Sequence, residues 1–258
     1  MPGNVLNVLA FFAHPDDETM LCGGTLALLA AAGARVHYLI ATRGEGGEVG
    51  DPPLCTQAEL GKVRAAEMKC AVQALGGVSL DFLDYVDPMV GADNTLFPFE
   101  AELEQVVDAL SHFLRYLQVD AIITHGANGE YGHPAHRLVN QAASAAVNAS
   151  AAQARLLYHV QAAFENHPRP HLMNKDEPAH LVLETAAVKD AKTAAALCHR
   201  SQHALFVRRA SERAGRALTV AVVITTLESL HRAYPPVDGA LQDDLARLLQ
   251  GTGAVIAA

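Results

Sequence analysis

A short run of residues near the start of the chain combines an imidazole with neighbouring carboxylates. His14, Asp16 and Asp17 directly follow the apolar segment 4–12, where the pattern predicts that a strand turns into a helix. An imidazole and a carboxylate can bind a divalent metal ion, while a second carboxylate remains free to act as a base. This turn therefore suggests a metal-dependent hydrolase.

A second turn supplies two more imidazoles, His133 and His136. A hydrolytic zinc site uses three protein ligands and leaves the fourth position to water, whose pKa the metal lowers to about 7. Two histidines and one aspartate from these turns make such a set. Because consecutive residues at a helix start point in different directions, Asp16 and Asp17 cannot easily share one role. We expect one to bind the metal and the other to take a proton from the water.

Both turns also have an ordinary structural explanation. Pro15 followed by acidic residues is a good helix start, since the acids face the positive end of the helix dipole. His133 and His136 could likewise be surface histidines at the start of a helix. This interpretation leaves unexplained why His14 stands directly between a strand and the acids, and why the His-Pro pattern occurs twice.

Apolar, β-rich stretches alternate with longer segments of helical periodicity, which is typical of βαβ units around a parallel sheet. The fold class is therefore α/β, with a Rossmann-like, mostly parallel sheet flanked by helices. Ligands of such sheets bind beyond the carboxyl ends of the strands, so the two histidine turns can meet at that edge. A nucleotide-binding module would need a glycine-rich first turn, which this chain lacks. Strands are predicted at 5–12, 36–41, 80–83, 121–124 and 156–160, and helices at 17–32, 58–75, 100–117, 134–147, 188–199 and 241–249.

Three long polar stretches lie between these elements. Residues 42–56 and 84–98 carry Gly, Pro and acidic residues, and loops of this length are usually functional, so we expect them to line the site. Residues 166–178 contain His167 and His171 at irregular spacing. We interpret this third stretch as a loop, at an interface, rather than as a metal-binding tract.

Length and composition suit one large domain. The 258 residues predict a single α/β domain over 1–258, in which the part after about residue 211 forms a C-terminal helical extension. Half of the residues are hydrophobic, yet no apolar run reaches the roughly 18 residues of a membrane-spanning helix. The first apolar stretch has no basic segment before it, so we expect a soluble, cytoplasmic protein without a signal peptide.

The net charge indicates which classes of partner the protein can bind, and the cysteines indicate the redox state of its compartment. A formal net charge of −9 disfavours nucleic acid and anionic membranes as partners and favours a small neutral or amine-bearing substrate. The cysteines form no close pair and no zinc-finger spacing. We therefore expect buried thiols in a reducing compartment, and no disulfide, at Cys22, Cys55, Cys70 and Cys198.

Taken together, several motifs resemble those of the PIG-L/LmbE-like N-deacetylases. This family includes deacetylases of N-acetylglucosaminyl-phosphatidylinositol and enzymes of mycothiol and bacillithiol biosynthesis. The resemblance covers roughly residues 4–202, and the last fifty or so residues add nothing to it. It rests on A-H-P-D-D-E (13–18), T-R-G-E-G-G-E (42–48), L-G-K-V-R-A-A-E (60–67), G-E-Y-G-H-P-A-H (129–136) and the late segment 192–202.

The resemblance implies specific roles. His14, Asp17 and His136 would bind Zn²⁺, or Fe²⁺ in the cell, while Asp16 acts as general base. His133 would donate a hydrogen bond or a proton as the tetrahedral intermediate forms and collapses. Tyr131 would help to polarise the amide carbonyl. The physical logic agrees, because amide hydrolysis needs a stabilised carbonyl oxygen and a protonated leaving amine.

The resemblance also implies substrate contacts. Arg64, Glu48 and Asp87 would form hydrogen bonds with sugar hydroxyls. Each has a structural alternative: Arg64 could pair with Glu67 on a helix surface, and Asp87 could start a turn before Pro88. His199 could lie near the site or at an interface, or it could simply be a cation at the C-terminal end of a helix. The resemblance is also compatible with a homo-oligomer.

One position departs from the family pattern. Many members have His-Pro-Asp-His, whereas this chain has Ala135 before His136, which removes a carboxylate that could orient His133. Either another group such as Glu130 takes over, or His133 acts as a neutral hydrogen-bond donor.

The expected reaction is hydrolysis of an N-acetyl group on an amino-sugar derivative. Two alternatives stay open: an amidase that cleaves a larger thiol or sugar conjugate, and a metal-dependent protein that binds sugars without cleaving them. A binder has no need of a free carboxylate beside the water, so Asp16 favours an enzyme.

Overall fold

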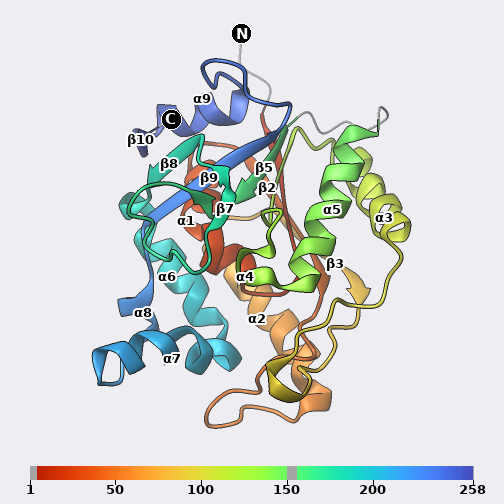
Figure 1. Ribbon diagram of the computed structural model, residues 1–258, viewed down its shortest axis with the longest axis vertical. Helices are drawn as coiled ribbons and strands as arrows, with labels where there is room; N and C mark the ends of the chain where they lie inside the picture. Colours follow the sequence, from red (N-terminus) through yellow and green to blue (C-terminus); the bar gives the residue numbers. More distant parts are fainter. Residues whose placement is uncertain (1–4, 150–155, 258) are drawn as a thin grey trace.

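A central sheet of eight strands runs through the molecule in the order β10-β8-β9-β5-β4-β1-β2-β3 (Figure 1). The computed structural model describes residues 5–149 and 156–257. The strands from β3 to β5 pair in parallel, and β9, β8 and β10 add antiparallel pairs at the other side. The predicted α/β class with a mostly parallel sheet is therefore confirmed. The strands are β1 (Asn7–Phe12), β2 (Arg35–Thr42), β3 (Ser79–Tyr85), β4 (Ala121–Thr124), β5 (Leu156–Val160), β8 (Leu181–Glu184), β9 (Leu227–Tyr234) and β10 (Val255–Ala257).

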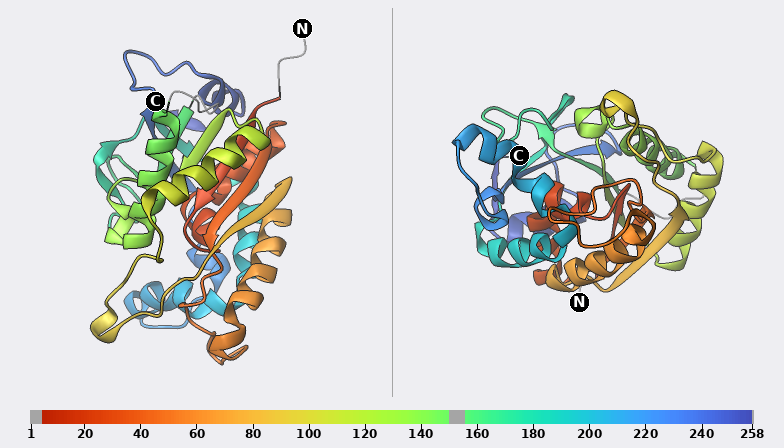
Figure 2. Two further views of the ribbon diagram at one scale, coloured as in Figure 1. Left: turned by 90° about the vertical axis from the view of Figure 1, so that its right-hand side faces the viewer. Right: turned by 90° about the horizontal axis from the view of Figure 1, so that it is seen from below.

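Helices cover both faces of the sheet (Figure 2). Strand β1 is apolar from Val8 to Phe12 because alternate side chains enter two different cores. Val8 and Phe12 pack with α1, α2, α6 and α9, whereas Leu9 and Phe11 pack with α3 and α5. These helices are α1 (Asp17–Ala31), α2 (Leu60–Ala74), α6 (Lys189–Cys198), α9 (Asp244–Gly251), α3 (Leu103–Tyr116) and α5 (Pro134–Asn148). Within the described ranges, no helix is long and apolar enough to cross a membrane.

The regions that sequence patterns left open contain regular structure. In the stretch 166–178, residues at its end form β7 (Asn174–Pro178), which pairs with β6 (Ala162–Ala163), so the prediction of a loop is wrong for that part. The segment after about residue 211 completes the main sheet with β9 and β10 and adds α9. The remaining helices are α4 (Gly129–Gly132), α7 (His203–Ala214) and α8 (Val220–Val223).

A buried ion pair joins β9 to the first helix. Helix α1 is broken at Cys22, where φ is −150°, and its second half starts at Gly24. Glu228 accepts the backbone N–H groups of Gly24 (2.9 Å) and Thr25 (2.7 Å). Lys192 of α6 donates to the same carboxylate at 2.6 Å, and both side chains are fully buried. A Cβ at Gly24 would lie 2.2 Å from the Thr185 hydroxyl, so glycine is required here.

Two of the cysteines are paired. Cys70 on α2 and Cys198 at the end of α6 form a disulfide across 128 residues of sequence. The expectation of no disulfide is therefore wrong, because helix packing brings together cysteines that show no spacing signal. Cys22 is a buried free thiol and Cys55 a partly exposed one, as expected for the first.

We predict that Lys192→Met destabilises the fold by about 3–5 kcal/mol, because it leaves the Glu228 carboxylate buried without its cation. The measurement is urea unfolding followed by circular dichroism. Lys189→Met, at an exposed position at the start of the same helix, is the matched control and should change stability by no more than about 0.5 kcal/mol. Equal stabilities of the two variants would contradict a role for the ion pair.

Candidate metal and catalytic site

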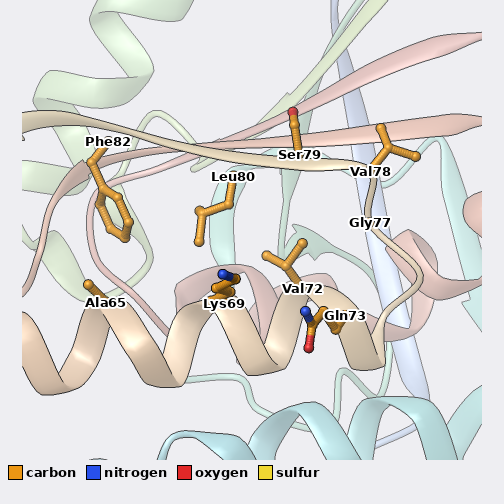
Figure 3. Close-up of a pocket in the computed structure, with 9 residues that line it drawn as sticks. All are labelled: Ala65, Lys69, Val72, Gln73, Gly77, Val78, Ser79, Leu80 and Phe82. Carbon is orange, nitrogen blue, oxygen red and sulfur yellow. The ribbon is translucent and has the colours of Figure 1, made fainter.

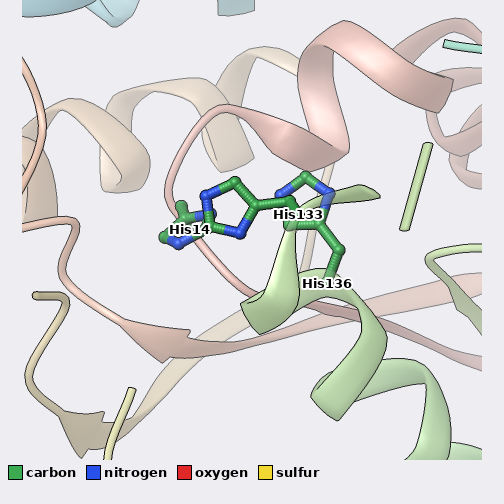
Figure 4. A group of neighbouring side chains, drawn as sticks. All are labelled: His14, His133 and His136. Atoms are coloured by element: carbon green, nitrogen blue, oxygen red, sulfur yellow. The ribbon is translucent and has the colours of Figure 1, made fainter. Parts of the chain in front are cut away.

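Two neighbouring parallel strands deliver the two histidine turns to one place. Strands β1 and β4 pair in parallel, with Phe11 opposite Thr124, so both chains leave the sheet at the same edge. Figure 4 shows His14 from the turn after β1 meeting His133 and His136 from the start of α5. The prediction that the two turns converge is confirmed.

Asp17 is the centre of this cluster. Its Oδ2 accepts the backbone N–H of His14 at 2.9 Å, and it lies 3.1 Å from His14 Nδ1 and 3.4 Å from His136 Nε2. Burial by itself would raise the pKa of Asp17, but His136, His125 and His14 hold it well below its usual value. A carboxylate that stays ionised between two imidazoles is a suitable metal ligand.

Glu130 fixes the orientation of His136. Its Oε2 lies 2.6 Å from His136 Nδ1, so this nitrogen donates and the other, Nε2, faces the cluster as an acceptor. His136 Nε2 is buried and has no hydrogen-bond partner among the described residues. An unpaired acceptor beside an ionised carboxylate fits a metal ion, and His14, Asp17 and His136 could hold it together.

His125, which sequence reasoning missed, lies as close to Asp17, at 3.5 Å. Its Nε2 accepts the backbone N–H of Ala13 at 3.0 Å and its Nδ1 pairs with Glu130 at 2.9 Å. Both nitrogens are therefore in use, and His125 supports the site rather than offering a ligand. Its position directly after β4 was the available signal.

Asp16 does not serve as a helix cap. Its φ of 104° places it in the left-handed region, and its side chain makes no capping hydrogen bond. The carboxylate lines the cavity and accepts from Arg64 at 3.0 Å. Burial raises the pKa of Asp16 to about 7, although Arg64 opposes the shift. A strained backbone that turns a carboxylate toward the cluster suits a base.

The three residues expected to meet a sugar differ in how they are engaged. Arg64 is buried, and its guanidinium donates to Asp16 and to the carbonyl of Gly44, so it orients Asp16. Asp87 Oδ1 lies 3.2 Å from His14 Nε2. Glu48 is held by both terminal nitrogens of Arg208, each at 2.7 Å.

His133 has no carboxylate partner within hydrogen-bonding distance in the described part of the chain. Its Nδ1 accepts the backbone N–H of Ala135 and caps α5. The idea that Glu130 orients His133 is wrong, because Glu130 is engaged with His125 and His136. Burial and the neighbouring imidazoles lower the pKa of His133 to about 3, which leaves it a neutral donor through Nε2.

The late segment 192–202 supports the site from behind. His199 is fully buried and lies 3.4 Å from Glu18, whose other oxygen accepts the backbone N–H of Asp16. Ser201 donates its N–H and its hydroxyl to Glu67 of α2, at 2.8 and 2.7 Å. His199 therefore approaches the site through Glu18, and it is also the C-cap residue of α6, so both of its expected positions are found.

The cluster opens into a cavity of about 410 Å³, lined also by parts of the loops 42–56 and 84–98, as expected. The exposed ring of Tyr131 lies on the same cavity, with its centroid 5.7 Å from that of His133. A second groove, of about 460 Å³, lies between α2 and β3 (Figure 3). It contains no carboxylate or imidazole in its lining, so it offers no metal chemistry.

Known proteins share this fold. An N,N'-diacetylchitobiose deacetylase from Pyrococcus horikoshii has a TM-score of 0.61 and 19% identity, covering 89% of this chain and 84% of its own. A 4-carboxy-2-hydroxymuconate hydratase from Pseudomonas putida has a TM-score of 0.63 and 22% identity, covering 92% and 100%. At these identities the likeness concerns the fold alone, and the two reactions differ.

Sequence comparison is more specific. A "1D-myo-inositol 2-acetamido-2-deoxy-alpha-D-glucopyranoside deacetylase" of Rhodococcus erythropolis is 38% identical over 167 residues, which span 60% of this chain and 57% of the relative. One of Catenulispora acidiphila is 31% identical over 276 aligned positions, covering 95% and 86%. In other matches, such as the one from Rhodococcus erythropolis, the chain spans only about half the length of the curated relative. Residues 9–147 match the family model described as GlcNAc-PI de-N-acetylase. On these matches, the chain belongs to the PIG-L family.

Proposed function

We propose that this protein is a metal-dependent N-deacetylase that hydrolyses the N-acetyl group of an amino-sugar derivative. The observation that carries the proposal is that two adjacent carboxylates, Asp16 and Asp17, line one cavity in different surroundings. Ionised Asp17 lies beside a buried His136 nitrogen that has no partner among the described residues, whereas Asp16 is separate and pairs with Arg64. The family and the names of the relatives support the same reaction.

His14, Asp17 and His136 would hold the metal, Zn²⁺ or Fe²⁺. When bound, such an ion supplies Lewis acidity and lowers the pKa of water. Asp16, kept in place by Arg64, takes the proton of the attacking water. His133 donates a hydrogen bond through Nε2 to the oxygen on which charge develops.

The remaining groups shape the substrate side. Tyr131 lies over His133 at the cavity and is available to polarise the amide carbonyl. Asp87 is placed beside His14, and the exposed Glu48 lies at the cavity through its pair with Arg208. A small amino-sugar substrate fits a cavity of about 410 Å³. A cytoplasmic location and a homo-oligomer stay predictions.

Two other functions use the same residues. A sugar-binding protein would keep the metal and the ligand without turnover, and an amidase for larger conjugates would release an acid other than acetate. The strained, partly buried Asp16 favours catalysis over binding, since a binder gains nothing from a carboxylate held in the left-handed region.

The test combines metal content with acetate release. We expect the wild type to carry about one metal ion per chain, and His14→Ala to lose it. Asp16→Asn should keep the metal while kcat for N-acetylglucosamine derivatives falls about 10²–10⁴-fold, because the base is removed. Asp108→Asn, exposed on α3, is the control. Metal binding without turnover of any acetamido sugar or related amide would sink the enzyme proposal, and full activity of Asp16→Asn would sink its assignment as base.

We further predict that Glu130→Gln weakens metal affinity about 10–100-fold, because the amide no longer fixes His136 as a basic acceptor. The measurement is competition with a chromophoric chelator at fixed pH. Glu104→Gln, exposed on α3, should bind the metal as the wild type does. Wild-type affinity in folded Glu130→Gln would show that Glu130 does not support the metal site.

A further inference from the structure

The outer part of the cavity that holds the histidine cluster is apolar. Large hydrophobic side chains from three separate segments line it while remaining exposed: Val90 (48%), Phe97 (45%), Tyr131 (54%) and Leu205 (46%). Leu96 adds to the same lining. Exposed apolar groups that gather around one concave site mark a surface on which something apolar is buried.

We call Val90, Leu96, Phe97 and Leu205 the apolar rim. Close packing of the loop 84–98 against the loop 42–56 holds three of these residues in place. A Cβ at Gly91 would lie 2.8 Å from the ring of Phe97, and a Cβ at Gly46 would lie 1.9 Å from the carbonyl oxygen of Pro88. The backbone contact at Gly46 requires glycine and seats the loop 84–98 on the loop 42–56, whereas the contact at Gly91 packs Phe97 within the loop 84–98. The backbone N–H of Asp87 adds a hydrogen bond to Glu45 at 3.0 Å.

Most polar groups near this rim already have partners. Both carboxylate oxygens of Glu48 accept from Arg208, and the amide nitrogen of Gln202 donates to the Glu48 carbonyl and to Ser201. Asn94 and the hydroxyl of Tyr131 are the remaining polar groups of the outer lining. A ring with many hydroxyls would require free donors and acceptors here, and displacing engaged ones is unfavourable.

Leu205 lies on α7, outside the residues 9–147 that match the family model. Figures 1 and 2 place α7 and the loop 84–98 at the same end of the molecule. The match to the family model therefore says nothing about this wall of the cavity.

We propose that the rim binds an apolar substituent of the amino-sugar substrate, an alkyl or aryl group carried by the aglycone or by the N-acyl chain. The inference rests on the proposed function for the sugar itself. It distinguishes the substrate of this chain from an inositol glycoside, whose second ring is polar over its whole surface.

The test is a comparison of two substrate series on metal-loaded protein. One series is the methyl, butyl and hexyl glycosides of N-acetylglucosamine with the same anomeric configuration, and the other is the methyl glycoside with N-acetyl, N-butanoyl or N-hexanoyl groups. Full burial of one methylene is equivalent to about fourfold in affinity, so we expect kcat/KM to rise at least about tenfold along one series, even in an open cavity. The series that rises identifies the position of the substituent.

Variants connect the preference to the rim. In the responsive series, we compare kcat/KM of the six-carbon compound with kcat/KM of the shortest compound. Leu205→Ser and Phe97→Ser should each lower this ratio by about threefold or more. Leu197→Ser, on α6 with a similar exposure of 47% and no part in the cavity, should keep the wild-type ratio. Flat rates along both series, or equal ratios in all variants, overturn the proposal.

Failure of the proposed function has a different signature. If no compound is hydrolysed, calorimetric titration of the same protein with the methyl and hexyl compounds decides the question separately. Tighter binding of a hexyl compound, lost in Leu205→Ser, supports the rim in a non-catalytic protein. Equal affinities for methyl and hexyl compounds overturn it.

Discussion

The arrangement of the site depends on one buried carboxylate, that of Asp17. An ionised group removed from water needs compensating partners, and here the backbone N–H of His14 donates to Asp17 while the imidazole of His14 lies 3.1 Å away. The unpaired Nε2 of His136 faces the same carboxylate at 3.4 Å and leaves a position that a cation can fill. Each imidazole in turn needs an acceptor on its far side, which Asp87 and Glu130 provide. The result is a chain of alternating acids and imidazoles that orients the side chains that we propose as metal ligands.

The same requirement explains why so many charged groups are buried around the cluster. Glu130 accepts from two imidazoles and from the N–H of Gly126, so it links the end of β4 to the start of α5. On the other side, Arg64 and Glu18 hold Asp16 by its side chain and by its backbone. The carboxylate that we assign as base is thereby separated from the carboxylate that we assign as ligand, although the two are adjacent in the chain.

Much of the fold and the centre of the site could be predicted because their signals are local. Strand β1 is apolar from Val8 to Phe12, and both His-Pro turns follow predicted strands. Strand β9 escaped prediction because its charged residues, Glu228 and Arg232, are paired across the fold with Lys192 and Asp243. The disulfide and the Glu48–Arg208 pair join residues more than a hundred positions apart, for which one sequence contains no spacing rule.

The disulfide also changes what the backbone between its cysteines must do. The exposed loop 84–98 lies between Cys70 and Cys198, and it separates the turn of His14 and Asp17 from that of His136. A protease that cuts once in this loop leaves two fragments, each with part of the proposed metal-ligand set, which remain one covalent molecule through the S–S bond. A cut in this loop therefore does not release either half of the site. The two fragments can separate only after the disulfide is reduced.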